Sequence, residues 1–285
     1  MPAPAADPFA GFLMLLERER DDADGCGVAV IVAHPDDETI GIGAHLDRLS
    51  GMTIVHVTDG APRDLMDARL HGFADWRDYA AARRGEAERA LAEAGLAPCA
   101  LLCLGFPDKE AGRHLAELAR RLAAILAETG PRYLCTHSFE GGHPDHDATA
   151  FAVHAACRLL RERGGEPPFV VEMPLYHAGA DGPVYQDFCA EQPLPSASLL
   201  LNDAAYERKR RMLARHFTQR NVLAPFVARH ERFRAAPDYD FRALPNGGRL
   251  FYETLPVGFT GSDWQQSARA AIDALAQETP AAGPS

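Results

Sequence analysis

The first 175 residues alternate between two hydrophobic patterns. Continuous apolar runs rich in β-branched residues are typical of strands that are covered on both faces. Such runs lie at residues 26–33, 52–58, 99–104, 132–136 and 169–173. Between them the pattern predicts helices, at residues 39–49, 78–94, 113–128 and 147–163. This alternation is typical of βαβ units, so we expect an α/β fold with a Rossmann-like, mostly parallel sheet flanked by helices.

Beyond residue 175 the pattern weakens. It predicts a loop over 177–198, a helix over 203–219, a second helical segment over 224–234 and a late strand over 250–255. We expect these C-terminal elaborations to belong to a single domain over residues 1–275, with a core of about residues 25–175. The Pro-, Ala- and Gly-rich residues 276–285 predict a disordered tail.

Charge and composition exclude several classes of protein. The 285 residues carry a formal net charge of −11, which argues against nucleic-acid binding and against docking on anionic lipid. Apolar residues 11–16 are followed at once by charged residues 17–20, so they predict a short amphipathic helix rather than an export signal. No apolar run approaches the roughly 18 residues that a membrane helix needs. We therefore expect no membrane insertion and a cytoplasmic location.

The six cysteines give no sign of metal binding. They stand at 26, 99, 103, 135, 157 and 189, and no two form a Cys-x-x-Cys pair. All but Cys189 lie in apolar segments, so we expect buried free thiols rather than a disulfide scaffold or a cysteine-ligated metal.

Ionisable side chains follow the predicted strands where each strand ends. His-Pro-Asp-Asp-Glu occupies residues 34–38, and a segment with three histidines occupies residues 137–147. Ligands of open parallel sheets bind outside the carboxyl ends of the strands. We therefore expect these two segments, distant in sequence, to meet at one edge of the sheet.

The residue types in these segments suit a catalytic zinc ion. Such a site uses three nitrogen or oxygen ligands and leaves a position for water, whose pKa falls to about 7. His34 and Asp37 can converge on one ion, and the third ligand would come from His143 or His146. Of the adjacent carboxylates Asp36 and Asp37, one can bind metal while the other accepts the proton of the water.

A structural role competes with this hypothesis. Asp36 could cap the following helix, with Pro35 placing the turn and His34 a satisfied polar residue. Two histidine-rich strand ends in one sheet favour the metal site, because helix caps do not need paired histidines. The sequence has no phosphate-binding Gly-rich loop after a strand and no Gly-x-Ser-x-Gly, which argues against a nucleotide cofactor and a serine nucleophile.

The two motifs together resemble a known family. Ala33-His-Pro-Asp-Asp-Glu38 with Gly142-His-Pro-Asp-His146 is similar to the PIG-L/LmbE-like deacetylases, and the resemblance covers about residues 25–175. That family includes the N-acetylglucosamine deacetylases of GPI-anchor, mycothiol and bacillithiol biosynthesis. The resemblance implies an LmbE-like fold and the site roles that follow. Zinc would be bound by His34, Asp37 and His146; Asp36 would be the general base; His143, in its protonated form, would stabilise the oxyanion; and Asp145 would orient His143.

The sequence departs from the family at one catalytic position. Some relatives place a tyrosine just upstream of the second motif to help stabilise the oxyanion, whereas residues 140–142 here are Glu-Gly-Gly. That donor is missing or comes from another segment. Arg63 and Asp108 stand where relatives often keep substrate contacts, and His177 follows the fifth predicted strand, so these three are candidate substrate-binding residues.

The sequence therefore predicts a zinc-dependent hydrolase that deacetylates an N-acetylated amino sugar or glycoconjugate. Fe²⁺ or Co²⁺ would also suit the ligands. The alternative is a zinc amidohydrolase that acts on an N-acylated secondary metabolite or peptide, and a third hypothesis is an inert carbohydrate-binding protein. The expected partner is a small amino-sugar substrate, and self-association into a homo-oligomer is compatible with the sequence.

Overall fold

The protein is built around a seven-stranded sheet with strand order β3-β2-β1-β4-β5-β9-β8. The computed structural model describes residues 7–18, 27–49, 51–97, 101–190 and 194–277. The sheet strands are β1 (Val28–Val32), β2 (Thr53–Thr58), β3 (Leu101–Phe106), β4 (Tyr133–His137), β5 (Phe169–Met173), β8 (Ser196–Leu200) and β9 (His230–Ala235). The first five run parallel, and β9 and β8 are added antiparallel at one edge.

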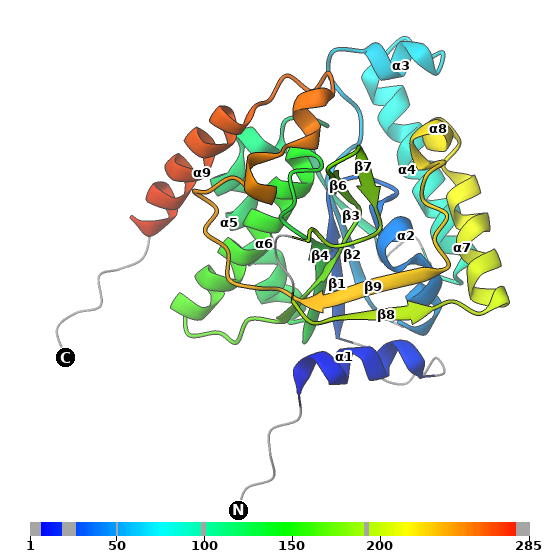
Figure 1. Cartoon of the computed structure of the whole chain (residues 1–285), viewed down its shortest axis with the longest axis horizontal. Coiled ribbons are helices and arrows are strands. Elements are labelled where there is room, and N and C mark those ends of the chain that lie inside the picture. Colours follow the sequence, from blue (N-terminus) through cyan, green and yellow to red (C-terminus); the bar gives the residue numbers. More distant parts are fainter. Residues whose placement is uncertain (1–6, 19–26, 50, 98–100, 191–193, 278–285) are drawn as a thin grey trace, which may run out of the picture.

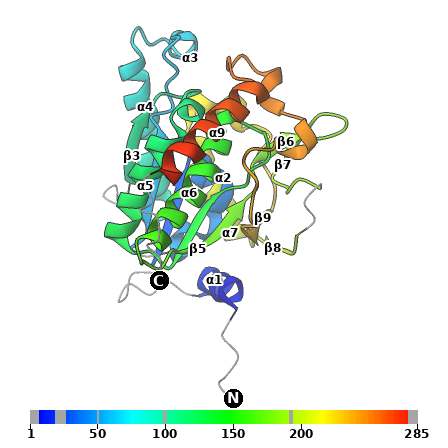
Figure 2. The ribbon, with the colours of Figure 1, turned by 90° about the vertical axis from the view of Figure 1, so that its left-hand side faces the viewer.

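Helices cover both faces of this sheet, as Figures 1 and 2 show. One face packs against α5 (Leu115–Thr129), α6 (Pro144–Glu162) and α9 (Gly261–Ala276), and the other against α1 (Pro8–Glu17), α2 (Asp37–Ile42), α4 (Trp76–Glu93) and α7 (Asp203–Arg215). Alternate residues of β1 explain the two layers. Ala29 and Ile31 enter the first core, whereas Val28, Val30 and Val32 enter the second.

The parallel half of the fold confirms the predicted pattern. In α5, Leu115, Leu118, Leu122 and Leu126 are all buried, and the helix ends at Gly130, whose positive φ of 54° suits a glycine. The predicted helix over 39–49 differs in detail, since α2 begins at Asp37 and gives way to a 3₁₀ helix over Gly43–Arg48. The described helices include none long and apolar enough to cross a membrane.

The C-terminal half corrects three predictions. The segment predicted as helical over 224–234 ends in strand β9, because Glu231 and Phe233 alternate toward the interior and the strand pairs with both β5 and β8. Residues 251–254 form a 3₁₀ turn rather than a strand. The predicted loop over 177–198 contains the two-stranded sheet of β6 (Tyr176–Ala178) and β7 (Pro183–Tyr185) and the start of β8.

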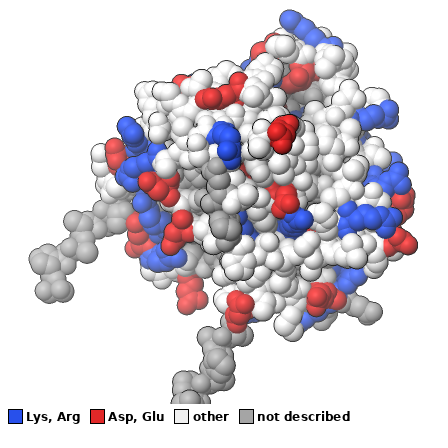
Figure 3. All heavy atoms as spheres, in the orientation of Figure 1, with Lys and Arg blue, Asp and Glu red and all other residues white. Residues whose placement is uncertain are grey.

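The thiols and surface charges also refine the picture. Cys135, Cys157 and Cys189 are buried, whereas Cys103 on the edge strand β3 is exposed, which the apolar pattern did not predict. Cys26, Cys99 and most of the predicted tail lie outside the described residues. Figure 3 shows acidic and basic side chains interspersed on the visible face, so the net charge of −11 does not gather in one patch there.

Candidate metal centre and catalytic site

The two histidine-containing motifs meet where the strand order of the sheet reverses direction. β1 and β4 are neighbours, while the chain leads from β1 to β2 on one side and from β4 to β5 on the other. The first motif follows β1 and opens α2, and the second follows β4 and opens α6. This topological switch point is where open α/β sheets bind ligands.

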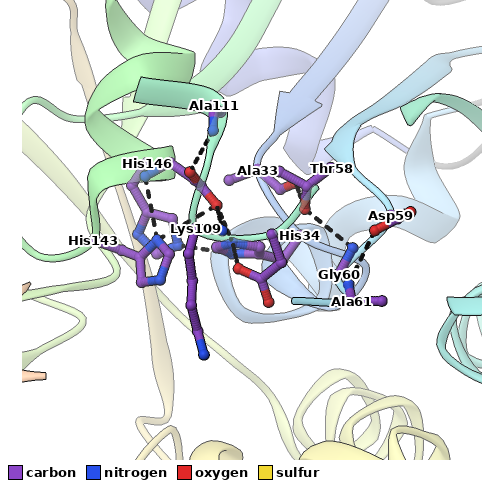
Figure 4. A network of polar contacts seen from close by, with 12 residues as sticks. Ala33, His34, Thr58, Asp59, Gly60, Ala61, Lys109, Ala111, His143 and His146 are labelled. Carbon is purple, nitrogen blue, oxygen red and sulfur yellow. Dashed lines mark hydrogen bonds and ion pairs between the residues drawn. The ribbon is translucent and has the colours of Figure 1, made fainter. Parts of the chain in front are cut away.

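Ligand atoms of three residues, His34, Asp37 and His146, converge at this point, and Figure 4 shows the first and the last of them. The Nδ1 atom of His34 lies 3.3 Å from Nε2 of His146 and 3.3 Å from Oδ2 of Asp37. Nε2 of His146 lies 3.5 Å from Oδ1 of Asp37. All three residues are at most 7% exposed.

These separations fit a metal ion. In a tetrahedral zinc site with bonds of about 2.0–2.2 Å, neighbouring ligand atoms lie about 3.3–3.5 Å apart. Three overlapping groups also have ligand atoms within 4.8 Å of one another, namely His34, His143 and His146; His34, Asp108, His143 and Asp145; and Asp37, His137 and His146. The donor set of imidazole and carboxylate is that of a divalent transition metal.

The carboxylate of Asp145 lies against His34. One of its oxygens, Oδ2, lies 3.2 Å from Nε2 of His34 and accepts a hydrogen bond of 2.6 Å from the backbone N–H of Lys109. Oδ1 accepts from the backbone N–H of Ala111 at 2.9 Å. A carboxylate on the outer nitrogen of a metal-binding imidazole fixes the ring and its tautomer. The distance from the same carboxylate to Nδ1 of His143, the residue it was predicted to orient, is longer at 3.9 Å.

His143 is held as a neutral imidazole. Its Nδ1 accepts the backbone N–H of Asp145 at 3.2 Å, so the ring proton is on Nε2. Burial, together with the nearby His34, lowers the pKa of His143 to about 3. The structure thus differs from the predicted imidazolium, since this ring can donate a hydrogen bond without carrying a charge.

A buried arginine holds Asp36. Nη2 of Arg83 donates to Oδ2 of Asp36 at 3.0 Å, and Nη1 donates to the backbone carbonyl of Gly60 at 2.7 Å. Burial raises the pKa of the Asp36 carboxyl above its usual range, against the opposing charge of Arg83. Asp36 occupies the N-cap position of α2, but its side chain makes no capping hydrogen bond. The competing role as a helix cap is therefore not seen in its contacts.

The three candidate substrate residues fall in different places. Asp108 lines the same cleft as the ligand atoms, with Oδ1 3.2 Å from Nε2 of His34. Arg63 does not line this cleft: it pairs with Asp59 at 2.7 Å and its guanidinium lies 3.5 Å above the Trp76 ring. His177 does not line it either.

Tyr176 takes the place predicted for His177. Successive residues of a strand point to opposite sides, so in β6 Tyr176 faces the cleft while His177 faces Glu140, 3.9 Å away. The Tyr176 ring lies 5.2 Å from that of His146. Its backbone carbonyl also presses on Gly142, where a Cβ atom would lie only 2.0 Å from the oxygen. The glycine before the second motif thus lets β6 lie against the segment that carries His143 and His146.

Sequence reasoning did not single out Arg83, His137 or Tyr176. His137 is the last residue of β4, and its Nε2 accepts the backbone N–H of Ala33 at 2.9 Å while its ring stacks on His146 at 4.1 Å. In the sequence, its place in the site was indicated by its position among three histidines at one strand end. Arg83 lies in an arginine-rich helix, where the sequence does not distinguish the inward-facing guanidinium from its exposed neighbours.

The ligand atoms lie in a cleft of about 420 Å³. This volume is in the range of roughly 300–1,000 Å³ that is typical of small-molecule sites. Charged and imidazole side chains form the part of the lining near the ligand atoms, and apolar side chains from the C-terminal half form much of the rest. The site can therefore bring a metal, a carboxylate and a neutral imidazole to one small molecule.

Comparison with known proteins agrees with this geometry. Residues 29–157 match the family model described as PIG-L, GlcNAc-PI de-N-acetylase. The 1D-myo-inositol 2-acetamido-2-deoxy-alpha-D-glucopyranoside deacetylase 2 of Catenulispora acidiphila is 33% identical over 158 residues, which is 47% of this chain and 52% of the relative. The corresponding deacetylase of a Nocardioides species is 31% identical over 158 residues, which is 45% and 52%. The chain thus spans about half the length of the curated relatives it matches.

Solved structures share the fold. The A40926 pseudoaglycone deacetylase aligns with a TM-score of 0.57 at 21% identity, over 76% of this chain and 100% of that one. The N,N'-diacetylchitobiose deacetylase of Pyrococcus horikoshii aligns with a TM-score of 0.54 at 20% identity, over 83% and 95%. The predicted Rossmann-like, mostly parallel architecture is confirmed.

Proposed function

We propose that this chain, whose residues 29–157 belong to the PIG-L family, is a metal-dependent hydrolase that removes the acetyl group from an N-acetylated amino sugar or glycoconjugate. The observation that carries the proposal is the convergence of three residues, His34, Asp37 and His146, whose ligand atoms lie 3.3–3.5 Å apart, beside a carboxylate and a neutral imidazole in one cleft. The deacetylase names of the curated relatives support the reaction class.

In this proposal His34, Asp37 and His146 hold the metal, and zinc is the ion we expect. His143 is not counted as a ligand, because its Nδ1 accepts a backbone N–H of the following helix and its Nε2 carries the ring proton. When bound, the metal would polarise the amide carbonyl and lower the pKa of a water molecule. The cytoplasmic location and self-association expected from the sequence stay predictions.

The chain's own residues supply the proton transfers. Arg83 binds Oδ2 of Asp36 and leaves Oδ1 to accept the proton of the attacking water and to return it to the amine nitrogen as the C–N bond breaks. Nε2–H of His143 would donate to the carbonyl oxygen as negative charge grows there. Asp145, anchored by two backbone N–H groups, would keep His34 in the tautomer that binds metal through Nδ1. Some relatives place a tyrosine upstream of the second motif as a further hydrogen-bond donor to the oxyanion. Tyr176, which faces the cleft, is our candidate for this role.

An assay of acetate release tests this function. Zinc-loaded protein should release acetate from glycosides of N-acetylglucosamine, should lose activity after chelation and should regain it when zinc returns. A matched panel of N-acetylated peptides distinguishes the alternative amidohydrolase. Release from the peptides alone would reject the amino-sugar substrate, and release that persists in the chelated protein would reject the metal mechanism.

A pair of histidine variants tests the roles. We expect His143→Ala to keep its zinc and to lose roughly 10²–10³-fold in kcat, as for other oxyanion donors. His146→Ala should lose the zinc itself. Metal analysis of the two dialysed proteins separates these outcomes, and the opposite result would reverse the two assignments.

A further inference from the structure

The cleft has two chemically different sides. The floor carries the ligand atoms together with Asp36, Arg83, Asp108 and Lys109. Among the charged residues that line the described cleft, Asp67 is the one that lies outside the floor. A second group of lining residues is apolar. Its members are Tyr185, Val222, Leu223, Pro225, Phe226, Phe251, Leu255, Pro256 and Val257, and we call this set the apolar wall.

The apolar wall is built by segments outside the family match. It comes from β7, from α8 (Arg220–Leu223) with the turn after it, and from residues 251–257. All of these follow residue 157, where the family match ends. In Figure 1, β7 and α8 both lie toward the end of the sheet that carries α3 (Met66–Leu70), the helix after β2. With the exception of Tyr176, the residues that we propose for the chemistry thus lie in a part of the chain separate from the part that forms the apolar wall.

The apolar wall has a fixed structure. Phe226 is 2% exposed, and its ring lies 5.3 Å from that of Tyr185 and 6.1 Å from that of Tyr176. Phe251 lies 5.7 Å from Tyr176, and its backbone N–H donates to the carbonyl of Gly141 at 2.7 Å. These contacts tie the wall to the loop that carries the second motif, so it has a defined position relative to the ligand atoms.

The wall also exposes apolar surface at the mouth of the cleft. Val222 lines the cleft and is 60% exposed, and Pro225 and Pro256 are exposed beside it. In the same segment Gln219 and Asn221 also line the cleft, so a bare amino sugar would find two polar side chains there and otherwise apolar surface. Exposed apolar surface that continues into a functional cleft is typical of a ligand-binding site.

From this division we propose that the natural substrate carries an apolar group beside its amino sugar, and that the group packs against the apolar wall. The inference rests on the proposed function, because the floor is taken to hold the amide. An apolar aglycone and a long N-acyl chain share this chemistry, and the experiment below distinguishes them.

Three compounds test the proposal. The reference is the methyl β-glycoside of N-acetylglucosamine; the hexyl β-glycoside adds an apolar aglycone, and the methyl glycoside of N-hexanoylglucosamine adds an apolar acyl chain. Calorimetry on zinc-loaded Asp36→Asn protein gives Kd without turnover. We expect one extended compound to bind at least about tenfold more tightly than the reference, as for methylene groups in apolar pockets. The tighter compound identifies the source of the apolar group.

Two valine variants in the same background localise the effect. Val222→Asp should remove most of the gain and leave binding of the reference unchanged. Val227→Asp is the matched control: this valine lies in the same segment and is 63% exposed, but does not line the cleft, and its substitution should change neither Kd. Equal Kd values for all three compounds, or equal effects of the two variants, would overturn the proposal. Tight binding without acyl release by the zinc-loaded wild-type protein would instead reject the proposed function alone.

Discussion

Two clusters of buried charge lie at opposite ends of α2. At its start Asp37 meets His34 and His146, and just beyond its end Glu231 meets Lys209 and His45. In the second cluster the charges are balanced within the chain. Nζ of Lys209 donates to Glu231 Oε1 and to the carbonyl of Ile40, both at 2.6 Å, and Glu231 Oε2 lies 2.6 Å from Nδ1 of His45.

The first cluster is not balanced in this way. Four carboxylates, Asp36, Asp37, Asp108 and Asp145, are at most 8% exposed, and Arg83 is the buried cation that contacts two of them. Burying charge costs free energy unless partners compensate it. A cluster that satisfies itself is a structural feature, whereas one that combines uncompensated carboxylates with converging ligand atoms is suited to bind a cation from solution. This contrast separates the two clusters, although both combine carboxylate, imidazole and basic side chains.

The largest expected effect is on the first cluster. Asp37→Ala removes one of three ligand atoms, so we expect metal affinity to fall by more than about 100-fold and activity to fall with it. The free energy of unfolding of the metal-free protein should change little. Metal analysis after dialysis, with chemical denaturation of the metal-free form, measures both quantities. Retention of stoichiometric zinc would show that Asp37 is not a ligand.

The matched change in the second cluster should act in the opposite way. Glu231→Gln leaves Lys209 without its buried anion, which costs about 3–5 kcal/mol of unfolding free energy in comparable pairs. The variant should still bind zinc at the wild-type stoichiometry. Denaturation and metal analysis on the same preparation test this, and loss of metal with unchanged stability would make the two clusters one site.

The pH dependence of stability sharpens the comparison. Burial would raise the pKa of Glu231, but Lys209 and His45 outweigh it and hold the pKa below its ordinary value of 4.5. The unfolded chain then binds the proton more readily, so the cluster stabilises the fold above about pH 4.5 and loses this contribution as the pH falls through the folded pKa. Unfolding free energies between pH 7 and 3 should fall less steeply in Glu231→Gln than in the wild type. Parallel curves would contradict this assignment.

A smaller effect is expected at Arg83. Arg83→Lys keeps a positive charge but cannot bridge Asp36 and the Gly60 carbonyl in the same way. We expect kcat to fall by about tenfold, KM to change little and the acid limb of the kcat/KM profile to move to higher pH. A loss of activity with an unmoved pH profile would indicate that Arg83 acts on the fold alone.

The parallel half of the molecule could be predicted because local pattern and tertiary position agree there. The strand runs are apolar since both faces are covered, and their polar ends mark the site. The placement of His34, Asp37 and His146 next to one another therefore follows from topology. β9 could not be predicted in this way, because its burial depends on pairing with β5 and β8, and its buried Glu231 and Arg234 look like surface residues in sequence. Arg83 and Tyr176 likewise reach the site through tertiary contacts.

Gly142 has a consequence for judging related genes. Any side chain at this position would meet the carbonyl of Tyr176, at 2.0 Å for a Cβ atom, so β6 or the segment leading to His143 would have to shift. A displacement of about 1 Å at a catalytic group can cost 10²-fold in rate. A paralogue that keeps every histidine and aspartate of both motifs but has alanine here would be classed as active from its motifs. We expect it to encode a folded, metal-binding and nearly inactive protein, so this codon distinguishes working genes from decayed ones.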